Sequence, residues 1–196
     1  MDIVELVIDE NNKELAIDAV SLVEYPAIES NWIFMSKDNN KLSLAKVDED
    51  KRLIIGAALI PNKLIYRRDD KGREYQVYFS EQTIKQASEL YLMSNNQSSA
   101  TYEHKEGITG VTAVESWIVS DTNNDKSNIY GLDLPKGSWV LSMKVENDEV
   151  WSKIKSQEVK GFSIEGYFLD KMATLSKPVD TDTEILAALA EILKIQ

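Results

Sequence analysis

Short apolar runs separated by polar turns extend along most of the chain. Runs rich in β-branched and aromatic residues predict strands at residues 15–23, 53–59, 64–66, 75–79, 100–104, 111–119, 139–145 and 159–169, with some strand at 41–47. The turn residues at 69–72 separate two of these runs and predict a hairpin. The pattern indicates a mainly β fold.

Two helices are predicted between these runs. After Ser80, apolar residues recur at helical spacing, which predicts a helix from Glu81 to about Met93 with Ser80 as its N-cap. Asn147 is expected to cap a second, short helix that continues to Lys155. The expected fold class is therefore α+β, mainly β with flanking helices.

The two ends of the chain differ in character from its body. Residues 1–170 are expected to form one domain, with the N-terminal strand within 14–27 and an exposed polar connection at 36–51. Residues 171–196 are expected to form a linker followed by an amphipathic helix at about 183–195. That helix would pack on the domain, mediate assembly or be removed.

Composition restricts the chemistry. With 196 residues, 43% hydrophobic and 28% charged, the chain can bury a full core. It has no cysteine, which excludes disulfides, thiolate zinc sites and cysteine nucleophiles. The net charge of −11 opposes nucleic-acid binding, and the longest apolar run, 53–61, is too short to span a membrane. No motif indicates a metal or cofactor, and we expect neither.

Candidate catalytic residues are few. His104 is the only histidine, so any histidine-dependent mechanism has one centre. If residues 100–104 are a regular strand, Tyr102 and His104 share a face. Ser163 lies between Gly161 and Gly166, where space for a substrate backbone is expected. Spacing alone does not distinguish a catalytic pair from a surface histidine and a serine in a crowded strand.

Six short motifs carry a resemblance to a known group. In order along the chain they are residues 101–105, 114–119, 125–127, 137–140, 150–151 and 161–166. They resemble the XkdF-like group of phage serine proteases, which is similar to the phage prohead proteases and to herpesvirus assemblin. The resemblance implies a closed or partly closed β-barrel surrounded by helices, with His104 and Ser163 as the catalytic pair.

The same resemblance leaves the third catalytic residue open. In prohead proteases, a strand that comes after the catalytic serine carries a Glu-Val-Ser-Leu-Val type motif, and Pro-Ala follows that motif. In this chain residues 19–27, near the N-terminus, resemble it. This implies a circularly permuted fold in which the N-terminal strand completes the barrel. Alignment places Ala19 where the acid would be, so neighbouring Asp18 is the first candidate. Glu165 and Glu115 are rivals, and Glu165 shares a strand face with Ser163.

The resemblance implies a prohead maturation serine endopeptidase. Its expected substrates are the phage scaffold and the major capsid protein, inside the assembling prohead in the host cytoplasm. Self-cleavage and homodimerisation are open alternatives. A non-catalytic scaffold or capsid-assembly protein with the same fold is the main alternative function. A binding module would instead use tryptophans as anchors, against the simpler interpretation that they pack in the core: Trp32, Trp117, Trp139 and Trp151.

Overall fold

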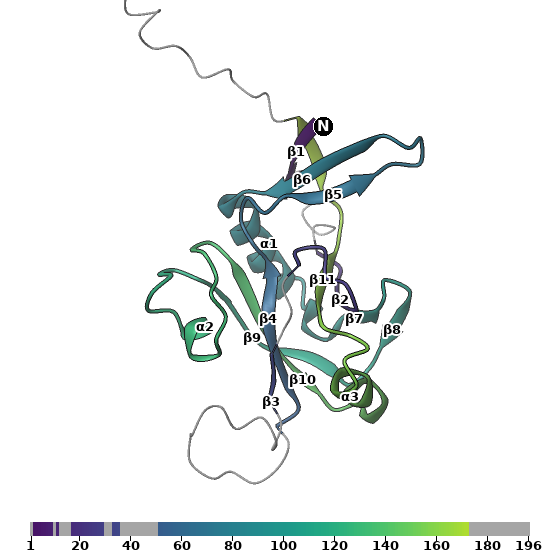
Figure 1. The fold of residues 1–196 in the computed structure, drawn as a ribbon, viewed down its shortest axis with the longest axis vertical. Helices are drawn as coiled ribbons and strands as arrows, with labels where there is room; N and C mark the ends of the chain where they lie inside the picture. Colours follow the sequence, from purple (N-terminus) through teal and green to yellow (C-terminus); the bar gives the residue numbers. More distant parts are fainter. Residues whose placement is uncertain (1, 10, 12–16, 30–32, 36–50, 173–196) are drawn as a thin grey trace, which may run out of the picture.

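The computed structural model describes residues 2–9, 11, 17–29, 33–35 and 51–172. These residues form three four-stranded sheets with a few helices, as Figure 1 shows. The predicted mainly β, α+β class is confirmed. The expected barrel is not found in this part of the chain, because the strands form three separate open sheets instead of one closed sheet.

The sheet that carries the candidate site has the order β11-β2-β7-β8. Its strands are β11 (Gly161–Glu165), β2 (Ala19–Val23), β7 (Ala100–Tyr102) and β8 (Glu106–Ile108). β2 pairs antiparallel with β11 and parallel with β7. The N-terminal strand β2 therefore lies between the serine strand and the strand that leads to the histidine.

A second sheet holds much of the hydrophobic core. Its order is β3-β4-β10-β9, formed by Ile33–Met35, Leu53–Leu59, Trp139–Val145 and Val111–Ile118. Six of the seven residues of β10 are buried, as expected for a central strand whose two faces are both covered. β11 lies close to β4, which brings the two sheets together.

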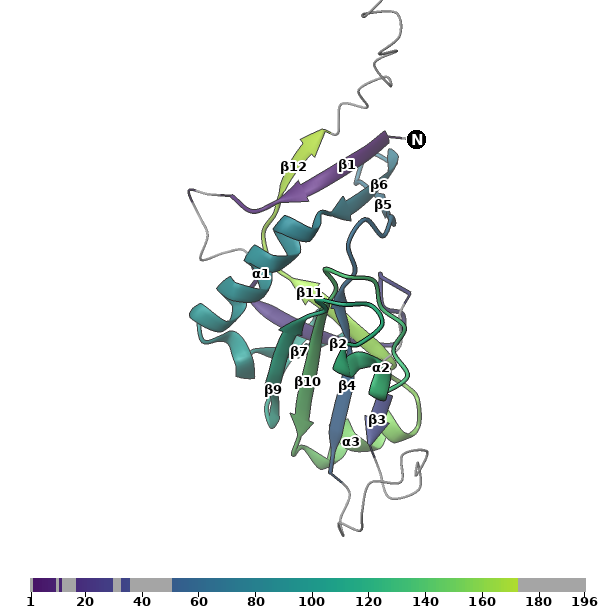
Figure 2. The same ribbon diagram turned by 90° about the vertical axis from the view of Figure 1, so that its left-hand side faces the viewer.

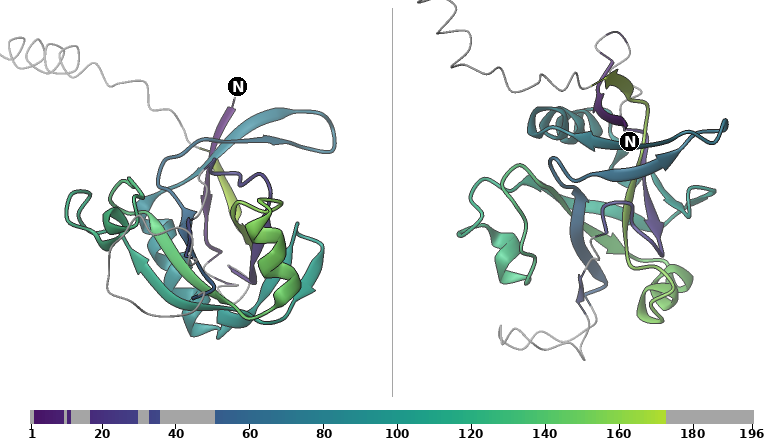
Figure 3. Two further views of the ribbon diagram at one scale, coloured as in Figure 1. Left: turned by 60° about the horizontal axis from the view of Figure 1, so that its bottom comes forward. Right: turned by 45° about the horizontal axis from the view of Figure 1, so that its top comes forward.

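The third sheet has the order β12-β1-β6-β5 and includes the predicted hairpin. Its strands are β12 (Leu169–Met172), β1 (Asp2–Val7), β6 (Glu74–Phe79) and β5 (Ile65–Arg68). The β5–β6 hairpin extends away from the rest of the structure in Figure 3. It is closed by the predicted turn, where Gly72 has a φ of +81°.

The two predicted helices are confirmed. α1 spans Glu81–Met93, and the Ser80 side chain accepts a hydrogen bond from the backbone N–H of Thr83 as its N-cap. α3 spans Asp148–Lys155 and is capped by Asn147. α1 packs beside the sheet of β9 and β10 in Figure 2, where Tyr91 contacts Trp139 edge-on at 5.4 Å. A one-turn helix α2 (Lys126–Ile129) and a 3₁₀ turn η2 (Asn96–Ser98) complete the helical segments described.

The tryptophans that can be described favour core packing. Trp139 and Trp151 are fully buried, and the half-buried Trp117 donates its indole N–H to Asp125. Trp32 lies outside the described residues. These positions do not present exposed aromatic anchors.

Several strand predictions need correction. The strand expected at 100–104 ends at Tyr102, because the chain turns at residues 103–105. The long strand expected at 159–169 is divided into β11 and β12, since the chain leaves one sheet after Glu165 and pairs with β1 in another. The strands β1, β3 and β8 were not predicted. Residues 41–47, 173–196 and the start of the 14–27 strand lie outside the described part. No helix of the described residues is long and apolar enough to cross a membrane.

Candidate active site

A row of hydroxyl residues crosses the centre of the β11-β2-β7 sheet. Ser163 on β11 is directly opposite Ser21 on β2, and Ser21 is in turn level with Thr101 on β7. Residues in register across neighbouring strands project their side chains to the same face. Glu165 is two positions from Ser163 on β11, so it belongs to this face as well.

His104 lies in the turn that follows β7 and not in a strand. Glu103 and His104 have φ angles of +49° and +57°, and the N–H of Lys105 bonds back to the carbonyl of Tyr102. Two consecutive positive φ angles are the arrangement of a type I′ turn, which usually contains glycine or asparagine. The expectation that Tyr102 and His104 share a strand face was therefore wrong. The turn nevertheless directs His104 toward the hydroxyl row.

Glu165 binds the His104 imidazole. Nδ1 of His104 lies 3.0 Å from Oε1 of Glu165, and the hydroxyl of Thr101 donates to the same oxygen. An ionised carboxylate only accepts hydrogen bonds, so in a neutral imidazole this contact favours the tautomer that carries its proton on Nδ1 and has Nε2 as an acceptor. The His104 and Glu165 side chains are 45% and 27% exposed, so the pair lies at the surface where a polypeptide could reach it.

The histidine turn is attached by three hydrogen bonds to β2 and to Glu24, the residue that follows β2. The N–H of His104 donates to Oγ of Ser21 at 2.9 Å, and the N–H of Glu103 donates to the carbonyl of Leu22 at 3.1 Å. The carboxylate of Glu103 accepts from the N–H of Glu24 at 2.6 Å. Strained backbone persists where surrounding contacts fix it, and here β2 supplies those contacts.

Ser163 is half-buried, and its hydroxyl makes no hydrogen bond with the described residues. His104 and Ser163 thus share one sheet face without a direct hydrogen bond between their side chains. Such contacts are often long in a free enzyme and shorten when substrate binds. A hydroxyl, an imidazole and a carboxylate therefore lie on one sheet face, and these are the groups that nucleophilic catalysis by serine uses.

The structure separates the three candidate carboxylates. Glu165 contacts the imidazole, whereas Asp18 is exposed and contributes its backbone N–H to the carbonyl of Glu165. Asp18 precedes β2, and it is Ala19 that lies opposite Glu165. Glu115 is on β9 in another sheet, where it pairs with Lys126 at 2.9 Å. Among the described residues, no hydrogen bond or ion pair joins Asp18 or Glu115 to His104.

Neighbouring contacts connect β7 to α3 and the loop after it. The hydroxyl of Tyr102 donates to Glu158 at 2.6 Å, and the ammonium of Lys153 lies 4.1 Å from the Tyr102 ring centroid. The hydrogen bond to the Glu158 carboxylate is the main cause that raises the pKa of Tyr102 to about 12. The phenol therefore stays protonated and keeps donating at neutral pH.

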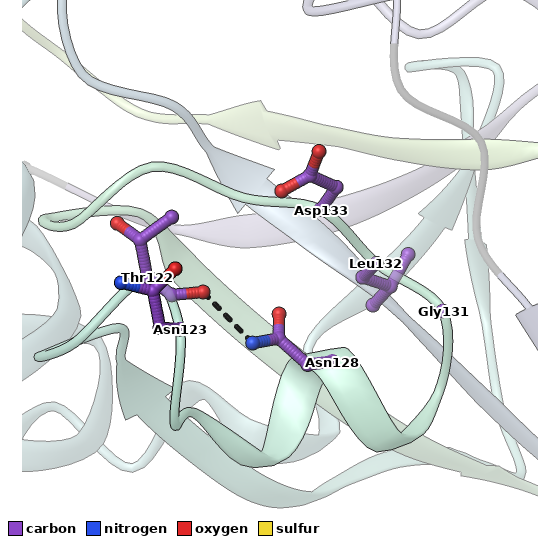
Figure 4. A pocket seen from close by; sticks show the side chains of 6 residues that line it. All are labelled: Thr122, Asn123, Asn128, Gly131, Leu132 and Asp133. Carbon is purple, nitrogen blue, oxygen red and sulfur yellow. Dashed lines mark hydrogen bonds between the residues drawn. The ribbon is translucent and has the colours of Figure 1, made fainter.

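No cluster of metal-binding side chains is found among the described residues. An open hollow of about 320 Å³ lies in the loop around α2, lined by polar residues and Leu132, as Figure 4 shows. In Figures 1 and 3, α2 is on the other side of the molecule from β7 and β8. The hollow is therefore separate from the His104 site.

Two residues of the site were not singled out from the sequence. Thr101 and Ser21 lie within motifs that carried the resemblance, but their hydrogen bonds depend on the pairing of β2 with β7. The buried serine in the otherwise apolar sequence Ala-Val-Ser-Leu-Val was the signal that could have indicated Ser21.

Comparison with known proteins gives the family. A family described as "Putative phage serine protease XkdF" matches residues 41–170. The chain belongs to this family. It is also similar to the uncharacterized protein YqbD of Bacillus subtilis (strain 168), with 26% identity over 151 residues. The alignment covers 77% of this chain and 42% of YqbD, so the chain spans less than half of that relative's length. No solved structure matches.

The range matched by the XkdF family includes β7 and β11, which carry Thr101 and Ser163 of the hydroxyl row. The strand β2, which lies between them, precedes the matched range. The family name indicates a phage serine protease and therefore a hydrolase.

Proposed function

We propose that the protein is a serine endopeptidase of phage head assembly that uses Ser163, His104 and Glu165. The observation that carries the proposal is the contact of Glu165 with Nδ1 of His104, on the same sheet face as Ser163. Membership of the XkdF family supports the reaction class.

In the proposed mechanism, Nε2 of His104 takes the proton of Ser163 as the hydroxyl oxygen attacks a peptide carbonyl. Glu165 holds the imidazole in the tautomer with the proton on Nδ1 and stabilises the imidazolium that forms. The imidazolium then protonates the leaving amine, which breaks the peptide bond and leaves an acyl-serine. Water activated by His104 hydrolyses this ester and restores the free hydroxyl.

In this proposal Glu165, and not the first candidate Asp18, is the third catalytic residue. It extends from the serine's own strand over the β2 position occupied by Ala19. In prohead proteases the corresponding motif carries its acid where this chain has Ala19. We therefore propose that the third catalytic acid is on β11 in this chain and not on β2. We also propose a circular permutation, in which β2 occupies the position in the fold of a strand that comes after the catalytic serine in those relatives.

We propose the scaffold and the major capsid protein as substrates, inside the prohead in the host cytoplasm. The net charge of −11 disfavours direct contact with packaged DNA and is consistent with protein substrates. Self-cleavage within residues 171–196 and homodimerisation belong to the same proposal and would be detected as a shortened chain and a doubled mass.

The test is incubation of the purified protein with purified scaffold and major capsid protein of the same phage. Cleavage is expected with the wild type and with Ser152→Ala, a control that removes a hydroxyl from α3, and is expected to be lost in Ser163→Ala. Cleavage by Ser163→Ala would contradict the proposal.

A non-catalytic assembly protein is the second candidate. The observation that favours it is the lack of a hydrogen bond between the Ser163 hydroxyl and described residues, His104 included. In that case, scaffold would bind without being cut, and Ser163→Ala would leave binding unchanged.

A further inference from the structure

We propose that Ser21 is a positioning residue, whose hydroxyl holds the His104 turn in the conformation that brings the imidazole to Glu165. This rests on the proposed function of His104 and Glu165. Ser21 is not part of the proton transfer and would act through the histidine backbone.

The first argument is the burial of a polar side chain. Ser21 is 0% exposed in a strand whose five residues are all buried and whose other members are apolar. A buried hydroxyl without a partner costs about 1–3 kcal/mol, so a serine here requires a hydrogen bond. The partner in the structure is the backbone N–H of His104, at 2.9 Å from Oγ of Ser21.

The second argument is the conformation of the turn. Glu103 and His104 both have positive φ, although neither is glycine or asparagine. A left-handed residue with a side chain costs about 1–2 kcal/mol, so this turn needs external support. Of the three hydrogen bonds that hold the turn, only the one that the Ser21 hydroxyl accepts uses a β2 side chain and involves His104 itself.

The third argument is location. Ser21 is in register with Ser163 on one side and with Thr101 on the other, so it occupies the middle of the hydroxyl row. Its hydroxyl is therefore in contact with the histidine turn and beside the proposed nucleophile. If the His104 N–H lost this acceptor, the turn could relax to negative φ, and the ring would leave the Glu165 carboxylate.

The experiment compares Ser21→Ala with Ser142→Ala, which removes a buried strand hydroxyl in the β10 sheet. Two readouts are used. The first is the rate at which a fluorophosphonate probe phosphonylates the Ser163 hydroxyl, with fluoride as the leaving group. The second is the NMR spectrum of protein labelled with ¹⁵N-histidine, in which the only histidine gives unambiguous amide and ring signals.

For Ser21→Ala we expect labelling to be slower by about 10- to 100-fold, because a displacement of about 1 Å is enough for such a loss. The His104 amide should lose protection from hydrogen exchange, and its ring signals should shift. Ser142→Ala should change the labelling rate by no more than about twofold and should leave the His104 amide and ring signals in place.

The proposal is overturned if Ser21→Ala labels at the wild-type rate with unchanged His104 signals. If wild-type Ser163 is not labelled at all, the proposed function fails, and the His104 amide and ring signals alone decide the role of Ser21. If Ser21→Ala does not fold, Ser21→Thr keeps the acceptor oxygen, and retained His104 amide protection supports the proposal while its loss overturns it.

Discussion

Glu165 on β11 and Ala19 on β2 are directly opposed, and the Glu165 carboxylate contacts His104 and Thr101 beyond β2. Ala19 is small and buried, so its methyl group leaves room for the longer side chain to cross the strand. Alignment with the prohead protease motif places an acid at position 19, where this chain has alanine. The Glu165 carboxylate, which comes from β11, crosses β2 at this position.

The first prediction concerns variants that remove the carboxylate from position 165 on β11 and place one at position 19 on β2. Glu165→Ala should lower the rate at which a fluorophosphonate labels Ser163 by about 10²- to 10⁴-fold, the range expected for loss of a group that orients a general base. Adding Ala19→Glu should recover part of this loss, because it returns a carboxylate to the same face. Labelling kinetics of the single and double variants measure both effects. Equal rates for wild type and Glu165→Ala would contradict the role of Glu165.

The tautomer of His104 is a second prediction. In the wild type, ¹⁵N NMR of the single histidine should show that the neutral imidazole carries its proton on Nδ1 and not on Nε2, because the Glu165 carboxylate accepts from Nδ1. Glu165→Ala should shift the population toward the tautomer protonated on Nε2. Asp18→Ala serves as the control and should leave the spectrum unchanged. A wild-type spectrum in which the neutral imidazole carries its proton on Nε2 would be inconsistent with this site.

The sequence predicted the elements that have strong local signals. Ser80 and Asn147 were identified as helix caps because their hydroxyl and amide groups satisfy the first N–H groups of a helix. The turn at His104 could not be predicted, since neither Glu103 nor His104 is a residue that normally signals positive φ. The contacts that stabilise it come from β2, about 80 residues away in the chain.

The choice among carboxylates failed for a similar reason. Alignment gave Ala19, and the neighbouring Asp18 was the first candidate, but one step along a strand reverses the face on which a side chain projects. Glu165 was recognised as sharing the face of Ser163, yet its approach to His104 requires β2 to lie between β11 and β7. That order of strands is a property of tertiary pairing and is not encoded in the spacing of the motifs.

A third prediction concerns alkaline pH. The Glu158 carboxylate raises the pKa of the Tyr102 phenol to about 12, above its ordinary value of 10.0. The stabilisation from this contact is therefore fully present below pH 10.0 and is lost as the pH rises through about 12. The ultraviolet absorbance titration of Tyr102→Phe, subtracted from that of the wild type, should show one tyrosinate that forms near pH 12. In Glu158→Gln the same tyrosinate should form at lower pH, and an unchanged titration would exclude the contact.

A fourth prediction concerns acid and the loop around α2. Burial raises the pKa of Asp125, but the hydrogen bonds from Ser127 and the Trp117 indole outweigh it, so the pKa is lowered from 3.8. A lowered carboxyl pKa gives stability that is present above pH 3.8 and lost as the pH falls through the folded-state value. The stability advantage of wild type over Asp125→Asn, measured by urea unfolding, should shrink in that range. An advantage that stays constant into strong acid would refute this.

The most direct test of the central claim is mass spectrometry of the protein after reaction with a fluorophosphonate. The account predicts one adduct, on Ser163, that is absent in Ser163→Ala and formed far more slowly in His104→Asn, a variant chosen because asparagine accepts positive φ. No adduct in the wild type, or an adduct on Ser163 that forms equally fast in His104→Asn, would contradict it.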